Sequence, residues 1–367
     1  MLKLSKDEDM AAVTDLLMGR KGSNEEAKTA STASTEGRKR VVFLGTPEVA
    51  ATALLQIHSE GIKQNKWEVV ACVTQPPRPF GRKRTLRPSP VHTTSDSLSI
   101  PVLTPEKATD KDFLDDLARI KPDLCITAAY GCYLPKRFLS TPPLGTLNIH
   151  PSLLPLYRGA SPVQRSLENG DPKIGVSVLY TVKAMDAGPV LRRVEVEDDG
   201  EKGTSVVLGE LFEIGTEALT GVMGDVLEGK VGWEDAETQR EEEATKAAMI
   251  DVGEGEIKVW DVEAREAKDR IRAFDVWPGC HIWVRIEGEE GERKLKIGKG
   301  RVLEGKWAEG EDGAGNAKVG KWGAKVRCKG DTVLELLRVQ PEGKKMMDAK
   351  SWVNGLGGRG FEVVEKK

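Results

Sequence analysis

The chain has 367 residues, of which 39% are hydrophobic and 31% charged, and its formal net charge is −3. This length and apolar content are sufficient for two globular domains, each with its own core. The longest weakly polar run, residues 124–135, is too short to cross a bilayer and contains Gly131, so we expect a soluble protein without a membrane span.

The cysteines and histidines are scattered along the chain. Five cysteines without CxxC spacing argue against a disulfide framework and a zinc site, and they favour a reducing compartment. None of the four histidines, at positions 58, 92, 150 and 281, forms the i, i+4 pair of a metal-binding helix. We therefore expect no metal.

Residues 1–39 are rich in Ser, Thr, Ala, Lys and Glu and lack apolar periodicity after positions 16–18, which predicts a disordered extension. A transit peptide is basic and poor in acids, whereas this segment holds many of both, so it is only a possible targeting segment. We expect a mitochondrial address, with a plastid or a bacterial-type cytoplasm as alternatives.

Order begins at residues 41–45, an apolar run that ends in Gly45. Thr46, Pro47 and an apolar-periodic stretch over 49–57 follow, which predicts a turn and a helix with Thr46 as N-cap and Pro47 in the first helical position. Further strands are predicted over 67–74, 124–128, 145–150 and 173–182, and helices over 110–120, from 135 and over 204–227. This alternation predicts a Rossmann-like α/β domain over 40–228 with a mostly parallel sheet.

The second part of the chain has a different pattern. Residues 229–250 are polar and acidic at first and are interpreted as a linker. A short amphipathic helix over 264–273 is then followed by short strands between Gly-rich turns, over 281–286, 294–297, 324–328 and 332–339. This pattern predicts a small OB-like β-barrel over 251–367, in which residues 304–323 form an enlarged loop.

Three polar residues suggest a reaction centre. Asn148 and His150 are two apart in a strand, so they share a face at its carboxyl end, where open α/β sheets bind ligands. Asp186 follows in a turn before Gly188. An amide that donates to an oxyanion, an imidazole base and a carboxylate that fixes the imidazole tautomer or stabilises its charged form suit acyl transfer to an amine. The alternative is that these are ordinary strand-end and turn residues.

Two regions carry excess positive charge. Residues 74–95 contain no acid and five basic residues, which are Arg78, Arg82, Lys83, Arg84 and Arg87. They lie among prolines and a glycine, in a flexible segment able to approach phosphates. Residues 291–345 hold fourteen Lys or Arg against eight Asp or Glu, so the barrel could also bind an RNA backbone. In both cases a solvated surface remains the alternative.

Residues 147–155, Leu-Asn-Ile-His-Pro-Ser-Leu-Leu-Pro, resemble the signature of folate-dependent formyltransferases. The continuation over 156–164, Leu-Tyr-Arg-Gly-Ala-Ser-Pro-Val-Gln, is similar to the methionyl-tRNA branch of that family, and residues 42–50, 74–91, 272–279 and 336–345 also match it. The resemblance implies an enzyme that transfers the formyl group of 10-formyltetrahydrofolate to the α-amino group of methionyl initiator tRNA.

The same resemblance implies residue roles. Asn148, His150 and Asp186 would be catalytic, the loop of Ser152, Leu153, Leu154 and Pro155 would contact folate, and the basic loop would enter the acceptor end of the tRNA. Phe80 departs from the small residue that is usual in relatives. We expect no metal or redox cofactor, and a monomer.

Two alternatives stay open. One is a 10-formyltetrahydrofolate-dependent enzyme that acts on a small amine, either a sugar nucleotide or glycinamide ribonucleotide, which the basic loop and the barrel disfavour. The other is an inactive RNA-binding relative, which the presence of all three polar residues disfavours.

Overall fold

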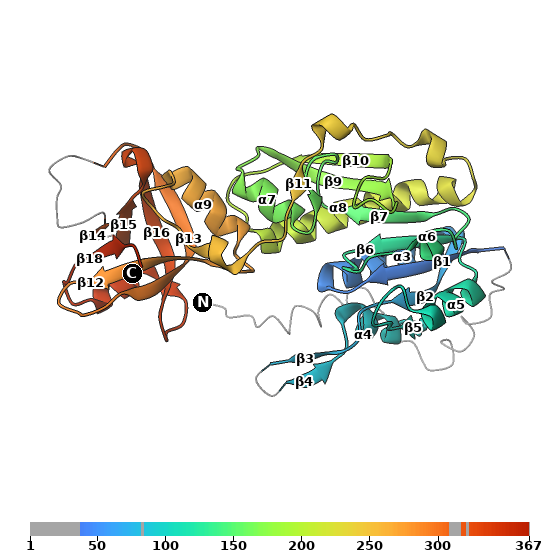
Figure 1. Cartoon of the computed structure of the whole chain (residues 1–367), viewed down its shortest axis with the longest axis horizontal. Coiled ribbons are helices and arrows are strands. Elements are labelled where there is room, and N and C mark those ends of the chain that lie inside the picture. Colours follow the sequence, from blue (N-terminus) through green and yellow to red (C-terminus); the bar gives the residue numbers. More distant parts are fainter. Residues whose placement is uncertain (1–36, 82–83, 308–316, 321–322, 367) are drawn as a thin grey trace. The chain divides into compact units, whose positions relative to one another are not determined.

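The computed structural model describes residues 37–81, 84–307, 317–320 and 323–366 (Figure 1). The chain divides into residues 1–38 and a compact unit, Lys39–Lys367, which contains the helices and strands of both sheets. The expectations for residues 1–36, for Arg82 and Lys83 and for most of the enlarged loop therefore lie outside the described residues. Within the described ranges, no helix has the length and apolar character needed to cross a membrane.

The first sheet has seven strands in the order β10-β9-β7-β6-β1-β2-β5. The strands from β7 to β5 pair in parallel, while β9 is antiparallel to β7 and β10 is antiparallel to β9, which confirms a mostly parallel sheet. Their bounds are β1 Lys39–Gly45, β2 Trp67–Val73, β5 Val102–Leu103, β6 Leu124–Ala128, β7 Thr146–His150, β9 Lys173–Tyr180 and β10 Val190–Glu197.

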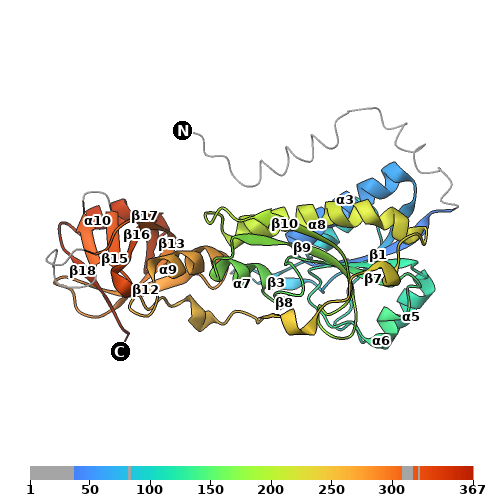
Figure 2. The same cartoon turned by 90° about the horizontal axis from the view of Figure 1, so that it is seen from above.

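Helices cover both faces of this sheet. Along β1, Val41 and Phe43 pack in the cluster that includes α3 and α8, whereas Val42 and Leu44 pack in the cluster that includes α5 and α6. Figure 2 shows the first pair of helices above the sheet and the second pair below it. The helix bounds are α3 Glu48–Gln64, α4 Pro90–Ser97, α5 Lys111–Ile120, α6 Lys136–Leu139, α7 Pro162–Glu168 and α8 Thr204–Leu227.

The start of α3 differs from the prediction. Pro47 is the N-cap residue, and the Thr46 hydroxyl donates to the carbonyl oxygen of Tyr130 at 3.2 Å instead of capping the helix. The prediction was wrong because the hydroxyl joins the ends of β1 and β6, a long-range contact that local spacing does not reveal. The helix also runs beyond residue 57, through Gly61, where an added Cβ would lie 2.7 Å from Nε1 of Trp67.

The second sheet is antiparallel, in the order β14-β15-β16-β13-β12-β18, and β17 pairs with β16. Because β14 and β18 also contact each other, the sheet nearly closes into a barrel, as predicted. The bounds are β12 Cys280–Ile286, β13 Arg293–Leu303, β14 Ala317–Gly320, β15 Gly323–Arg327, β16 Val333–Pro341, β17 Met347–Asp348 and β18 Phe361–Val364, with α9 at Ala264–Ala273 and α10 at Ala349–Gly355.

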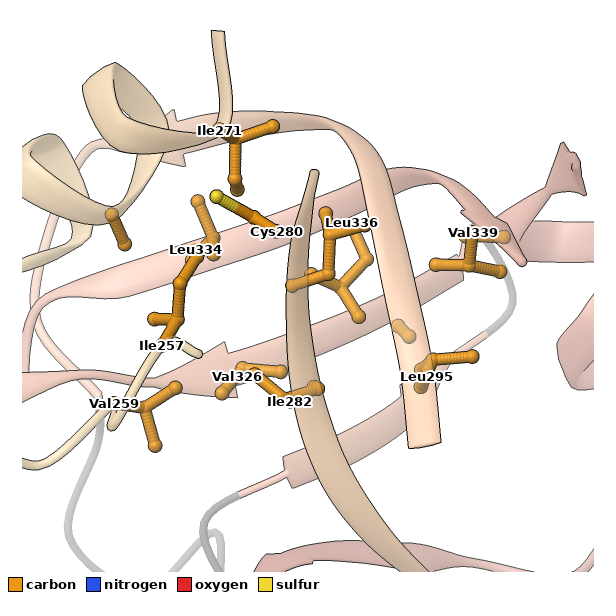
Figure 3. Packing of buried hydrophobic residues seen from close by; sticks show 14 of the residues in the cluster. Ile257, Val259, Ile271, Cys280, Ile282, Leu295, Val326, Leu334, Leu336 and Val339 are labelled. Carbon is orange, nitrogen blue, oxygen red and sulfur yellow. The ribbon is translucent and has the colours of Figure 1, made fainter. Parts of the chain in front are cut away.

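The barrel core is apolar. Figure 3 shows Ile282, Leu295, Val326 and Leu336 among the side chains of the four central strands, with Ile271 of α9 beside them. The same cluster continues into α7 and α8.

A buried ion pair adds to the contact between α9 and the first sheet. Arg272 of α9 lies 2.7 Å from Asp198, which follows β10, and both side chains are at most 6% exposed. Arg272 Nε also donates to Asp269 Oδ1 at 2.8 Å. Buried charges are tolerated when they are paired in this way.

The segment 229–250, predicted as a linker, contains η2 (Trp233–Asp235), η3 (Glu241–Glu243) and β11 (Lys246–Ala247), and η4 (Val252–Gly255) follows it. Glu237 forms an antiparallel bridge with Val190, and β11 pairs in parallel with β8 (Arg158–Gly159). The segment is thus held against the first domain at two places.

Candidate active site

The carboxyl ends of β1, β6 and β7 meet at one edge of the first sheet, because these strands are parallel neighbours. The chain returns to the centre of the sheet between β5 and β6, so this edge contains the change of direction at which open α/β sheets bind ligands. Asn148 and His150 lie at the end of β7, on the same face of that strand.

The side chain of Asn148 is oriented by its neighbour on β6. The hydroxyl of Thr127, which is opposite Asn148 in the parallel ladder, donates to Asn148 Oδ1 at 2.7 Å. With its oxygen engaged, the amide presents Nδ2 as the group able to donate. Asn148 is half-buried, so this donor is accessible to a ligand.

The imidazole of His150 is 4% exposed and lies between two acceptors. Its Nε2 is 3.0 Å from the carbonyl oxygen of Tyr157, and its Nδ1 is 3.7 Å from Oδ1 of Asp186. Both partners can only accept, but only the carbonyl oxygen is within hydrogen-bond distance, so the geometry favours the neutral tautomer with its proton on Nε2 and its lone pair on Nδ1. Nδ1 is therefore the atom that can act as a base.

Asp186 is held in an unusual conformation. Its φ is +50°, a left-handed value that is uncommon for residues other than glycine. Oδ2 accepts from the backbone N–H of Gly159 at 3.0 Å, which leaves Oδ1 facing His150. In the tautomer with its proton on Nε2, Asp186 Oδ1 faces the Nδ1 lone pair, an arrangement that would stabilise the imidazolium once Nδ1 gains a proton.

Tyr157, whose carbonyl faces His150, is itself anchored at both ends. Its hydroxyl donates to Asp171 Oδ2 at 2.5 Å and accepts from Asn169 Nδ2 at 2.7 Å, and its backbone N–H donates to Thr245 Oγ1 at 2.8 Å. Burial, together with the hydrogen bond to Asp171, raises the pKa of the phenol to about 12. The hydroxyl thus stays protonated and its hydrogen bond to Asp171 persists.

The predicted folate loop is partly a packing element. Ser152 and Leu154 are 3% and 1% exposed, with the Ser152 hydroxyl donating to the carbonyl of Leu156 and Leu154 packed against Leu179. Leu153 and Pro155 remain partly exposed. Most polar groups of the loop backbone are bonded within the protein, including both the N–H and the carbonyl of Leu154. The side chains of Leu153 and Pro155 are therefore the parts of the loop available to a ligand.

The predicted basic loop forms a ribbon in which β3 (Arg78–Phe80) pairs with β4 (Thr85–Arg87), and all six strand residues are exposed. The sequence did not predict this hairpin, in which Arg78 pairs with Arg87 across the ladder. The Arg87 guanidinium lies 4.6 Å from the ring centroid of Phe80, a cation–π contact. Phe80 is 62% exposed.

Sequence reasoning did not assign roles to Thr127, Tyr157, Gly159 or Gln239, which orient the three candidate residues. Tyr157 and Gly159 lie in the motif over 156–164, shortly after His150 in the sequence. This closeness was the only sequence signal that could have indicated their roles. Among the described residues no group of three or more His, Cys, Asp or Glu could hold a metal ion. An amide donor, an imidazole base and a carboxylate suit acyl transfer to an amine.

Comparisons with known proteins identify the family of both domains. Residues 39–211 match the family model "Formyl transferase", and residues 249–357 match "Formyl transferase, C-terminal domain". Methionyl-tRNA formyltransferase of Ligilactobacillus salivarius (strain UCC118) is 36% identical over 326 residues, which cover 89% of this chain and 97% of that protein.

Two solved structures share the fold. WlaRD, a sugar 3N-formyl transferase crystallised with dTDP and 5-N-formyl-THF, aligns with a TM-score of 0.57 at 12% identity, covering 84% of this chain and 100% of that one. HypX from Aquifex aeolicus in complex with tetrahydrofolic acid aligns with a TM-score of 0.54 at 14% identity, covering 87% of this chain and 47% of that one.

Proposed function

Because the chain belongs to the methionyl-tRNA formyltransferase family, we propose that the site at the end of β7 formylates the α-amino group of methionyl initiator tRNA. The product is formylmethionyl-tRNA for translation initiation. The observation that carries this proposal is the arrangement of His150 Nδ1, 3.7 Å from Asp186 Oδ1, on the strand face that also bears Asn148.

We propose 10-formyltetrahydrofolate as the formyl donor. The donor set fits an acyl compound, because Asn148 Nδ2 is oriented by Thr127 and the partly exposed Leu153 and Pro155 offer apolar surface to a heterocycle. Ser152 and Leu154 are both buried and would hold that loop against the protein interior. The donor supplies a one-carbon unit at the oxidation level of formate.

The residues act on the protons and charge of the transfer. His150 Nδ1 accepts the proton that the amine loses as its nitrogen bonds to the formyl carbon, and Asp186 stabilises the resulting imidazolium. Asn148 Nδ2 donates to the formyl oxygen as negative charge develops there. As the bond between the formyl carbon and the nitrogen of the donor breaks, His150 gives its proton to that nitrogen. The imidazole is then neutral again.

The β3–β4 ribbon is the proposed contact for the acceptor end of the tRNA. Arg84 and Arg87 are exposed, and the segment 74–95 contains no acid to repel phosphate. Arg78 is also exposed, and its Nη2 donates to Gln75 Oε1 at 2.8 Å. Arg82 and Lys83 belong to the same proposal on sequence grounds.

The molecule that accepts the formyl group distinguishes the proposed function from its alternatives. Purified protein with labelled 10-formyltetrahydrofolate should formylate methionyl initiator tRNA far faster than free methionine, glycinamide ribonucleotide or an amino-sugar nucleotide. Faster transfer to either small amine would replace the proposal with the corresponding small-molecule formyltransferase. Transfer to none of them would support an inactive RNA-binding relative.

We further propose that the protein acts as a monomer in the mitochondrion. The mitochondrial proposal rests on residues 1–39, a segment rich in Ser, Thr, Ala and Lys that precedes the first strand. Light scattering tests the first suggestion. The location of a fluorescent protein fused behind residues 1–40 tests the second, with a plastid or cytoplasmic signal counting against it.

A further inference from the structure

Gln239 connects the segment after α8 to the turn that contains Asp186. Its side-chain nitrogen Nε2 donates to the carbonyl oxygens of Asp186 at 2.8 Å and Gly188 at 2.6 Å. Its Oε1 accepts from Arg158 Nε at 2.9 Å. Gln239 is only 6% exposed, so a buried amide uses both of its hydrogens on one turn.

This contact bears on the conformation of Asp186. A left-handed φ of +50° costs free energy in a residue with a Cβ and persists where the surroundings hold it. The two carbonyls that Gln239 binds are on either side of Ala187, so the amide fixes the turn across its tip. The direction of the Asp186 carboxylate depends on that turn.

The same segment also holds the other partners of the site. Gly159, whose N–H donates to Asp186 Oδ2, pairs with Ala247 of β11, and its φ of +131° and an added Cβ only 2.5 Å from the Ala247 carbonyl oxygen exclude a side chain there. Thr245 Oγ1 accepts from the N–H of Tyr157, whose carbonyl faces His150. The segment therefore supports the imidazole on both sides.

We propose that Gln239 is a positioning residue for formyl transfer, which holds the Asp186 turn so that the carboxylate faces His150. The inference rests on the proposed function, since it assigns Gln239 a part in the same reaction. Gln239 does not face the substrate in this role; it acts through Asp186.

Two substitutions separate the hydrogen bonds from the packing. Gln239→Glu keeps an acceptor for Arg158 but places oxygen against the two carbonyls, and Gln239→Met fills the volume without polar atoms. We expect kcat to fall by about tenfold to 100-fold in both, with KM for tRNA and for the formyl donor within about twofold, because misplaced groups impair the chemical step more than binding. Gln64→Glu is the matched control: it makes the same chemical change at an exposed site that contacts Glu60, and it should leave kcat unchanged.

A double-mutant cycle tests whether Gln239 acts through Asp186. In an Asp186→Asn background, Gln239→Glu should cause almost no further loss of kcat, since the carboxylate it positions is already gone. Losses that multiply in the double variant would assign Gln239 an independent, general structural effect and overturn the inference. Wild-type kcat in both Gln239 variants would overturn it as well.

Hydrogen exchange gives a readout that needs no substrate. The Gly159 amide, protected by Asp186 Oδ2, should exchange about tenfold faster in Gln239→Glu than in wild type by NMR, whereas Gln64→Glu should match wild type. Unchanged exchange would overturn the inference. If wild-type protein fails to formylate methionyl-tRNA, the proposed function fails, and the exchange experiment still decides the role of Gln239.

Discussion

His150 Nε2 lies 3.0 Å from the carbonyl oxygen of Tyr157, a contact that favours the ring tautomer with its proton on Nε2. In that tautomer the lone pair is on Nδ1, 3.7 Å from Asp186 Oδ1, and Nδ1 is the base in the proposed reaction. In many hydrolases a carboxylate fixes the tautomer of the catalytic imidazole. In the proposed reaction the Tyr157 carbonyl would do this for His150, and Asp186 would stabilise the charge of the imidazolium.

The first prediction concerns the oxyanion donor. Asn148→Ala should lower kcat by about 10² to 10³, because the amide that meets the developing negative charge is removed. The Asn148→Ala/His150→Ala double variant should lose less than the product of the single losses, since the residues act as a unit. Steady-state rates of formylation measure both, and strictly multiplicative losses would contradict a shared transition state.

The second prediction concerns the orientation of that donor. Thr127→Val keeps the shape of the side chain but removes the hydroxyl that holds Asn148 Oδ1, so the amide can rotate and kcat should fall by about tenfold. Thr127→Ser retains the hydroxyl and should stay close to wild type. Equal kcat for the two variants would show that Asn148 does not depend on Thr127.

The third prediction concerns the ribbon. Arg84→Ala/Arg87→Ala should weaken tRNA binding and reduce the slope of log K against log salt by about 1 to 2, nearly one for each lost phosphate contact. Binding of the formyl donor should not change. Lys111→Ala/Arg119→Ala removes two exposed cations from α5 and serves as the control. An unchanged salt slope for the ribbon variant would return the ribbon to a passive surface.

The fourth prediction concerns the buried ion pair. Asp198→Asn should lower the free energy of unfolding by about 3 kcal/mol, because Arg272 would lose a buried partner while retaining Asp269. Glu210→Gln, which breaks an exposed ion pair with Lys202, should cost less than about 1 kcal/mol. Urea denaturation measures the free energy of unfolding of both variants. Equal losses would show that the buried ion pair contributes no more stability than the exposed one.

The sequence predicted elements whose apolar residues follow a regular period. Residues 41–45 and 124–128 are buried strands, and β7 places Asn148 and His150 on one face because side chains alternate along a strand. In contrast, β10 was not predicted, because its first half, Val-Leu-Arg-Arg, does not alternate and the strand follows β9 without an intervening helix. The hairpin of β3 and β4 was not predicted either, because an exposed basic run has no apolar pattern.

The supports of the site could not be predicted by local reasoning. Gln239 lies among acidic residues that suggest a solvated segment, yet it is buried against a turn 53 positions earlier. Thr127 and Asn148 are 21 positions apart and meet only because β6 and β7 pair in register. Such contacts depend on the completed fold, which spacing along the chain does not specify.

The role of His150 as general base is tested most directly by the single-turnover rate of formyl transfer in wild type and His150→Ala, with the formyl donor bound beforehand and the reaction started by saturating methionyl initiator tRNA. We expect the rate to fall by about 10² to 10⁴ in His150→Ala, because the general base is gone. A rate within about twofold of wild type would fall far outside the range for loss of a general base and would show that His150 is not the base.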